Sequence, residues 1–130
     1  MKILVVDDDA IVIKSCRRIL EAEGFEVTTV PSADEALERI KIYDFDLVVI
    51  DVKMPKHDGM FLMREIKKNW PDIPIIVMSG YPTPETIADV QKLGAVQFIP
   101  KPFKPDEFMK SIRQVTQKMS HKRFFPTGAG

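Results

Sequence analysis

Apolar residues along the chain fall into two alternating patterns. Short, nearly continuous apolar runs are typical of strands buried in a sheet, and longer segments with apolar residues three or four positions apart are typical of amphipathic helices. The runs that predict strands are residues 3–6, 25–30, 47–51, 75–78 and 96–99. The segments that predict helices are residues 10–23, 32–41, 60–69, 84–93 and 105–118. The pattern therefore predicts a succession of strand–helix units.

Strands that alternate with helices in this way favour an α/β fold, with helices on both faces of a parallel sheet. Such a sheet binds its ligands beyond the carboxyl ends of the strands, where the strand order reverses. A length of 130 residues has room for one domain of this kind. We assign the domain to residues 1–119 and predict a C-terminal tail or linker at 120–130, where the apolar period stops.

Polar side chains that could take part in binding or catalysis follow four of the predicted strands. Asp7 and Asp8 follow the first strand, Asp51 ends the third, Ser79 follows the fourth and Lys101 follows the fifth. Because parallel strands end at one edge of their sheet, we expect these residues to converge. Carboxylates close together raise one another's pKa unless a cation neutralises them, and hard oxygen ligands with open water positions suit Mg²⁺.

The run of aspartates after the first strand also has a simpler interpretation, as a solvated turn that caps the first helix. We assign only Asp9 to that cap, because it lies nearest to the start of the helix and needs no metal to explain it. The matching positions of Asp51, Ser79 and Lys101 at other strand ends favour a metal site for the remaining two aspartates.

A carboxylate beside Mg²⁺, with a hydroxyl and an ammonium nearby, has the groups needed to accept a phosphoryl group. Asp51 would be the attacking group, Ser79 would donate a hydrogen bond, and Lys101 would balance charge on the transferred oxygens. Pro102 directly follows the lysine, and an X-Pro bond in the cis form is one way to aim that side chain into the site.

Composition narrows the possible partners. The 19 basic and 19 acidic residues cancel, which leaves no basic field for nucleic acid and no polybasic membrane anchor. The first apolar run ends in aspartates and is too short for a signal peptide or a membrane span. Cys16 is the single cysteine and lies in a helical apolar pattern, so we predict a packing role in a reduced compartment. These features predict a cytoplasmic protein that binds neither nucleic acid nor membranes directly.

The chain resembles the receiver domain of two-component response regulators, the CheY-like family, over about residues 2–119. The matching segments are residues 3–9, 51–55, 58–59, 79–80, 94–95 and 98–103. The resemblance implies a doubly wound (βα)5 fold with the flavodoxin-like strand order 2-1-3-4-5. It also implies that Asp51 accepts a phosphoryl group from a histidine kinase or phosphotransfer protein, and that the fourth helix, fifth strand and fifth helix form the readout surface.

The resemblance further implies a metal site for Mg²⁺ or Mn²⁺. Asp8, Asp51 and the backbone carbonyl of Lys53 would be direct ligands, and Asp7 would act through a water molecule. The protein would then catalyse its own phosphorylation from a donor and its own dephosphorylation, without being a conventional metabolic enzyme.

Ser79 and Phe98 match the switch pair of the family, in which the hydroxyl moves toward the phosphoryl group and the aromatic ring turns inward. Phe98 lacks a hydroxyl, so any role in switching is through packing, and ordinary core packing is the alternative. Lys53 and Tyr81 match variable positions at the edge of the cleft that tune the lifetime of the phosphoryl group, and we expect Tyr81 to shield it. His57 lies in a polar loop, and we expect it to be solvated.

Two other classes of function remain open. The first is a receiver-like scaffold that binds partners without phosphoryl turnover. The second is a haloacid-dehalogenase-type phosphatase, which would need a second acid two residues after its aspartyl nucleophile, where this chain has Lys53. A homodimer that forms on phosphorylation is a further partner expected for a receiver domain.

Overall fold

A single parallel sheet forms the centre of the computed structural model, which describes residues 1–124. Its strands are β1 (Lys2–Val6), β2 (Glu26–Val30), β3 (Leu47–Asp51), β4 (Ile75–Ser79) and β5 (Ala95–Pro100). They lie in the order β2-β1-β3-β4-β5, and every neighbouring pair is parallel. The α/β class and the strand order 2-1-3-4-5 are therefore confirmed.

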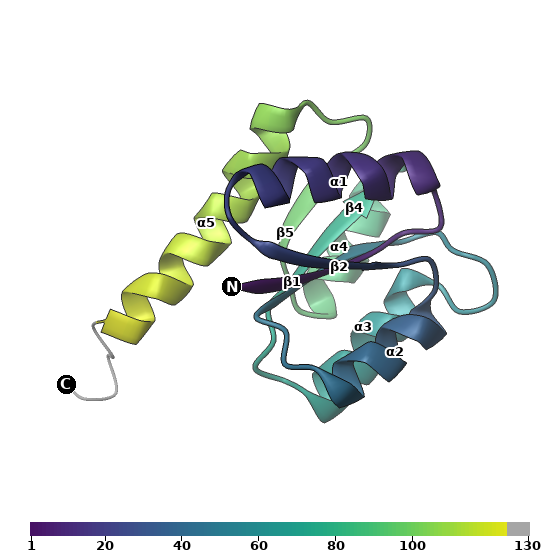
Figure 1. Cartoon of the computed structure of the whole chain (residues 1–130). Coiled ribbons are helices and arrows are strands. Elements are labelled where there is room, and N and C mark those ends of the chain that lie inside the picture. The colour runs from purple at the N-terminus through teal and green to yellow at the C-terminus, as the bar shows by residue number, and fades with distance from the viewer. Residues whose placement is uncertain (125–130) are drawn as a thin grey trace.

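Helices cover both faces of the sheet (Figure 1). They are α1 (Ala10–Ala22), α2 (Ala33–Ile42), α3 (Gly59–Asn69), α4 (Pro84–Lys92) and α5 (Pro105–Phe124). One hydrophobic cluster joins the sheet to α1 and α5, and a second joins the opposite face to α2, α3 and α4. Each helix therefore buries its apolar side against the sheet.

The central strands are apolar along their whole length because they are covered on both faces. In β1, Ile3 and Val5 pack toward α1 and α5, whereas Leu4 and Val6 pack toward the other helices. Every residue of β3 is buried. This two-sided burial is the physical reason why the strands appear in the sequence as unbroken apolar runs.

The prediction that the last helix ends near Lys118 is wrong, because α5 continues to Phe124. Between these residues the sequence contains neither glycine nor proline, so nothing interrupts the backbone hydrogen bonds of the helix. The rest of the predicted tail, residues 125–130, lies outside the described residues. The division into a domain of residues 1–119 and a tail stays a prediction.

The order of the strands reverses between β1 and β3. The chain leaves β1 for β2 on one side and returns to place β3 on the other. This reversal opens a crevice at the carboxyl ends of β1 and β3, which is where ligands bind in sheets of this type. None of the helices described in residues 1–124 has the length and apolar character that crossing a membrane requires.

Candidate functional site

Three carboxylates meet at the carboxyl ends of β1 and β3. Asp7, Asp8 and Asp51 each offer an oxygen atom, and these atoms lie within 4.8 Å of one another. Val6 pairs with Ile50 in the sheet register, so the residues that follow come together at one edge. Asp7 is 1% exposed and Asp51 is 6% exposed, whereas Asp8 faces solvent.

The ammonium of Lys101, directly after β5, reaches two of these carboxylates. The Nζ atom of Lys101 lies 2.6 Å from Oδ2 of Asp7 and 3.0 Å from Oδ1 of Asp51. The backbone N–H of Lys101 donates to the carbonyl of Ser79, which anchors the lysine to the end of β4. The peptide bond between Lys101 and Pro102 is cis.

Burial and like charges perturb the titration of the buried pair. Burial raises the pKa of the Asp51 carboxyl to about 6, and Asp7 and Asp8 add to the rise, while the bond from Lys101 opposes it. Burial alone would lower the pKa of Lys101, but its bonds to Asp7 and Asp51 raise it above the ordinary value. The ammonium of Lys101 bonds to two of the three clustered carboxylates, so the cluster keeps excess negative charge.

The donor atoms of this cluster fit a small divalent cation. Both oxygens of Asp7 are engaged, because Oδ1 accepts from the backbone N–H of Asp9 and Oδ2 accepts from Lys101. Asp8 makes no hydrogen bond within the described part of the chain and is open to water. Hard oxygen donors that leave room for water are the ligands that Mg²⁺ prefers.

Asp9 has the role predicted for it. Its side chain caps α1, with Oδ1 accepting from the backbone N–H groups of Ile11 at 2.9 Å and Val12 at 3.4 Å.

Cys16 is fully buried in the cluster under α1 and α5, and burial is the main cause that raises the pKa of its thiol to about 12. Its predicted packing role is confirmed, because a thiol in this state is a poor nucleophile.

Ser79, Tyr81 and Lys53 are connected by two contacts. Ser79 is 1% exposed, and its Oγ accepts from the backbone N–H of Tyr81 at 3.0 Å. The Nζ atom of Lys53 lies 3.9 Å from the centroid of the Tyr81 ring. The family resemblance predicted that both residues lie at the cleft edge, but it gave no sign that they touch.

Phe98 is half-buried and packs against the cluster beneath α2, α3 and α4. Its neighbour Ile99 belongs to the cluster on the other face. The alternation of residues along β5 predicts that Phe98 and Ile99 lie on opposite faces of the sheet. It does not say which residue lies on which face, and the sheet register decides this.

His57 is exposed to solvent, as predicted, but it also contacts two side chains of the fold. Its Nδ1 lies 3.0 Å from Oδ1 of Asp34, and its ring stacks on Phe61 with centroids 4.1 Å apart. The side chain stays half-exposed. Asp34 belongs to α2, and this contact depends on tertiary packing that local polarity does not encode.

Gly59 is a residue of the site that sequence reasoning missed. It begins α3, directly after the cap residue Asp58, and its N–H donates to the carbonyl of Val52 at 2.8 Å. A Cβ atom at this position would overlap the backbone carbonyl oxygen of Asp51. Glycine thus lets α3 approach the carboxylate strand, whereas the pair Asp58-Gly59 in the sequence indicates only a tight turn.

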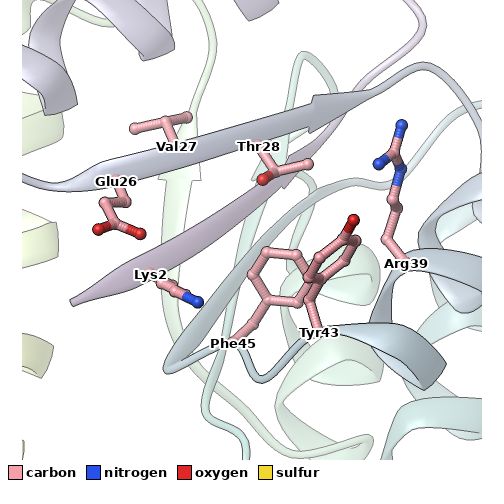
Figure 2. A pocket seen from close by; sticks show the side chains of 7 residues that line it. All are labelled: Lys2, Glu26, Val27, Thr28, Arg39, Tyr43 and Phe45. Atoms are coloured by element: carbon pink, nitrogen blue, oxygen red, sulfur yellow. The ribbon is translucent and has the colours of Figure 1, made fainter.

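Two cavities differ in their relation to this cluster. One of about 540 Å³ lies between α1 and the loop after β5, and Asp9 and Lys101 are part of its wall. Another, of about 330 Å³, lies at the opposite end of β1 and is lined by Lys2, Tyr43 and Phe45 among others (Figure 2). It contains none of the clustered carboxylates, so the chemistry belongs to the other end of the sheet.

Comparison with known proteins agrees with the geometry. The sequence model of the response regulator receiver domain matches residues 3–113. The chain is 38% identical over 116 residues to the hydrogenase transcriptional regulatory protein HoxA of Cupriavidus necator, covering 88% of this chain and 24% of that protein. It is 34% identical over 116 residues to the transcriptional regulatory protein FixJ of Bradyrhizobium diazoefficiens, covering 89% of this chain and 57% of that protein. The chain thus spans only part of the length of these relatives.

Solved structures give the same result. A CheY-like response regulator receiver domain protein from Methanospirillum hungatei superimposes with a TM-score of 0.87 at 31% identity, covering 93% of this chain and 97% of that one. A beryllofluoride-activated DrrB receiver domain superimposes with a TM-score of 0.82 at 28% identity, covering 89% and 97%. The likeness extends over nearly the whole of both chains.

Proposed function

The chain belongs to the response regulator receiver domain family, and we propose that it is a phosphorylation-activated switch whose phosphoacceptor is Asp51. The observation that carries the proposal is the buried carboxylate of Asp51 between two other aspartates and the ammonium of Lys101. Response regulators of this family are phosphorylated by histidine kinases. We propose that a histidine kinase or a phosphotransfer protein is the donor for this chain.

In the forward step an oxygen of Asp51 attacks the phosphorus of a phosphohistidine. The new P–O bond gives an acyl phosphate, the P–N bond breaks, and its electron pair goes to the imidazole nitrogen, which is then protonated from solvent. Hydrolysis switches the protein off: water attacks the phosphorus, and the P–O bond to Asp51 breaks to give inorganic phosphate, the free carboxylate and a proton. Lys101 offsets charge on the phosphoryl oxygens, and Ser79 donates a hydrogen bond to one of them.

The cation that this proposal requires is Mg²⁺ or Mn²⁺, and Asp8, Asp51 and the carbonyl of Lys53 would hold it directly. When bound, it supplies positive charge that neutralises the carboxylates and the phosphoryl oxygens. Asp7 acts through water, which is consistent with both of its oxygens being engaged by protein groups. Asp8 has neither oxygen engaged by a hydrogen bond from the described residues, which favours it as a direct ligand.

Binding of Mg²⁺ should depend on pH, because Asp51 titrates near pH 6. Above that pH the carboxylate is free to bind, and below it a proton competes, so the affinity falls by up to about tenfold for each pH unit. Titration calorimetry from pH 7.5 to pH 5 checks this. We expect Asp8→Asn to weaken binding at every pH, and the exposed Asp44→Asn to leave it unchanged. An affinity that does not vary with pH would contradict the role of Asp51 as a ligand.

The switch would work by population shift. The phosphoryl group adds about two negative charges, and only one arrangement of Ser79 and Lys101 satisfies them well. We propose that Ser79 moves toward the phosphoryl group and that Phe98 repacks beneath α4, changing the surface formed by α4, β5 and α5. Partners of the phosphorylated form, including a second copy of the chain, would bind that surface. We further propose that the switch works in the cytoplasm, without direct contact with nucleic acid or membrane by this segment.

Tyr81 should lengthen the life of the acyl phosphate. Its ring is more than half exposed and contacts Lys53, two residues after Asp51. From there we expect it to stand in the way of an attacking water molecule. We expect Tyr81→Ala to speed the loss of the phosphoryl group, by roughly three- to tenfold. Loss of phosphate from purified phosphoprotein, followed by mass spectrometry, measures the rate. An unchanged or slower rate would rule out shielding, and Tyr43→Ala, at the far end of β1, is the matched control.

A second candidate function, a scaffold without phosphoryl turnover, predicts a different result with a small-molecule donor. Incubation with acetyl phosphate and Mg²⁺ should add the mass of one phosphoryl group if the chain is a switch. No added mass from acetyl phosphate or from a phosphohistidine protein would favour the scaffold. The phosphatase alternative needs a second acid two residues after Asp51. This chain has Lys53 at that position, and its ammonium contacts the Tyr81 ring.

A further inference from the structure

Lys53 and Tyr81 contact each other across the loops that follow β3 and β4. Asp51 lies opposite Met78 in the sheet register, so the residues that follow these two strands face one another. The Lys53 ammonium lies 3.9 Å from the centroid of the Tyr81 ring, and the ring is 58% exposed. A cation–π contact with Lys53, rather than burial in the core, therefore holds the ring in place.

The backbone of Tyr81 connects this ring to two moving parts of the proposed switch. Its N–H donates to Oγ of Ser79 at 3.0 Å. Its carbonyl accepts from the N–H of Thr83 at 2.8 Å, and Thr83 is the cap residue of α4. The ring, the switch hydroxyl and the start of α4 are thus tied together through one residue.

We propose that Lys53 is a positioning residue that acts through the Tyr81 ring. It holds the Ser79 hydroxyl and the start of α4 in the unphosphorylated arrangement, and it releases them when a phosphoryl group forms on Asp51. The release step rests on the proposed function, whereas the holding step is a property of the unphosphorylated chain. We call the contact between Lys53 and Tyr81 the latch.

The release follows from electrostatics. The phosphoryl group places about two negative charges on a residue two positions from Lys53. Full negative charge attracts an ammonium more strongly than the quadrupole of a phenol ring does, so Lys53 leaves the ring. Without the lysine, Tyr81 no longer holds the Ser79 hydroxyl, which is free to turn toward the phosphoryl oxygens. The ring itself stays at the edge of the cleft, where it can still shield the phosphoryl group. An exposed contact of this type shifts an equilibrium by about two- to fivefold, which makes the latch a modest bias on the switch.

The holding step is tested without any phosphodonor. Amide chemical shifts of Tyr81 and Thr83 are compared in wild type, Lys53→Met and Lys53→Arg. We expect Lys53→Met to move both amides toward the positions seen with bound beryllofluoride, a phosphoryl mimic. Lys53→Arg should keep the wild-type positions, because a guanidinium also stacks on an aromatic ring. This rescue by charge separates a latch from a purely structural effect of the long side chain.

The ring side is tested through the affinity for beryllofluoride in the presence of Mg²⁺. Tyr81→Leu should bind the mimic about two- to fivefold more tightly than wild type, because the unphosphorylated state loses its anchor. Tyr81→Phe keeps the ring and should match wild type. Lys53 variants are unsuitable for this affinity readout, because the ammonium also attracts the mimic itself. In the double variant Lys53→Met/Tyr81→Leu the amide shifts should be no larger than in either single variant.

Identical Thr83 amide positions in wild type, Lys53→Met and Tyr81→Leu, together with an unchanged Tyr81 amide in Lys53→Met, would overturn the latch. Equal tightening of beryllofluoride binding by Tyr81→Phe and Tyr81→Leu would overturn it as well, because the ring would then not be the anchor. Failure of Asp51 to accept a phosphoryl group would instead contradict the proposed function. The comparison of unphosphorylated variants is unaffected by that result, so the two failures are distinguishable.

Discussion

Asp51→Asn is expected to abolish the gain of one phosphoryl mass that wild type shows with acetyl phosphate and Mg²⁺. The amide cannot act as the attacking oxygen, so the loss should be complete rather than partial. Intact-mass spectrometry measures it directly. The same variant should also fail to accept phosphate from a phosphohistidine protein, because both donor classes use the same acceptor.

The matched control is Asp72→Asn, which makes the same chemical change at an exposed aspartate in the loop before β4. It should keep the full mass gain. A gain of one phosphoryl mass by Asp51→Asn would show that another residue is the acceptor and would contradict the proposal for Asp51.

Asp51→Asn should at the same time stabilise the metal-free protein at neutral pH. The folded pKa of Asp51, about 6, lies above the ordinary value of about 3.9 for an unfolded chain. The folded state therefore binds more protons between these two values, and stability falls as the pH rises from about 4 to about 6. Asparagine has no such penalty, so we expect a gain of about 1–2 kcal/mol at pH 7.5 after allowance for solvent screening, and almost none near pH 4. Urea unfolding at both pH values measures this change and checks that the variant is folded.

Lys101→Met is the second substitution with a large expected effect. It removes the ammonium that bonds to Asp7 and Asp51 and leaves two buried carboxylates facing each other. We expect phosphorylation by acetyl phosphate to slow by about 10²-fold or more, the range for losing one preorganised charge partner. The free energy of unfolding at pH 7.5 should fall by about 2–4 kcal/mol, somewhat less than for a fully buried pair, since the Lys101 side chain is 17% exposed.

The pH dependence of this loss identifies its cause. Lys101 lowers the pKa of Asp51, so its removal should move that pKa above 6, and the pH window in which stability falls should extend upward. Lowering the pH below that window should then restore much of the lost stability. Lys104→Met, which removes an exposed lysine from the same loop, should change stability by less than about 0.5 kcal/mol. A stability loss in Lys101→Met that is independent of pH would indicate lost packing instead of uncompensated charge.

The fold of this protein could be predicted from local patterns. Unbroken apolar runs in β1, β3 and β4 reflect burial on both faces, and the intervening helical periods reflect one buried side. The strand-end positions of Asp7, Asp51, Ser79 and Lys101 followed from the same patterns, because parallel strands bring their carboxyl ends to one edge. The end of α5 was misjudged, since polar residues without a period still propagate a helix when no glycine or proline stops it.

Contacts between side chains from different units were not predictable in the same way. Lys101 bonds to Asp7 across 94 positions of the sequence, and the contact of Lys53 with Tyr81 depends on how two loops lie above neighbouring strands. The close approach of Gly59 to the backbone of Asp51 belongs to the same class. Each needs the strand order, the register and the direction of a side chain at once.

The sequence by itself determined the succession of strands and helices and which residues end each strand, because burial imposes a period on apolar residues along the chain. Only the tertiary structure decided which side chains touch: the two bonds of Lys101, the face of Phe98, and the contact that joins Lys53 through Tyr81 to Ser79. The period of apolar residues is a local property that can be read along the sequence. Distances between loops are set instead by the packing of the whole sheet and its helices.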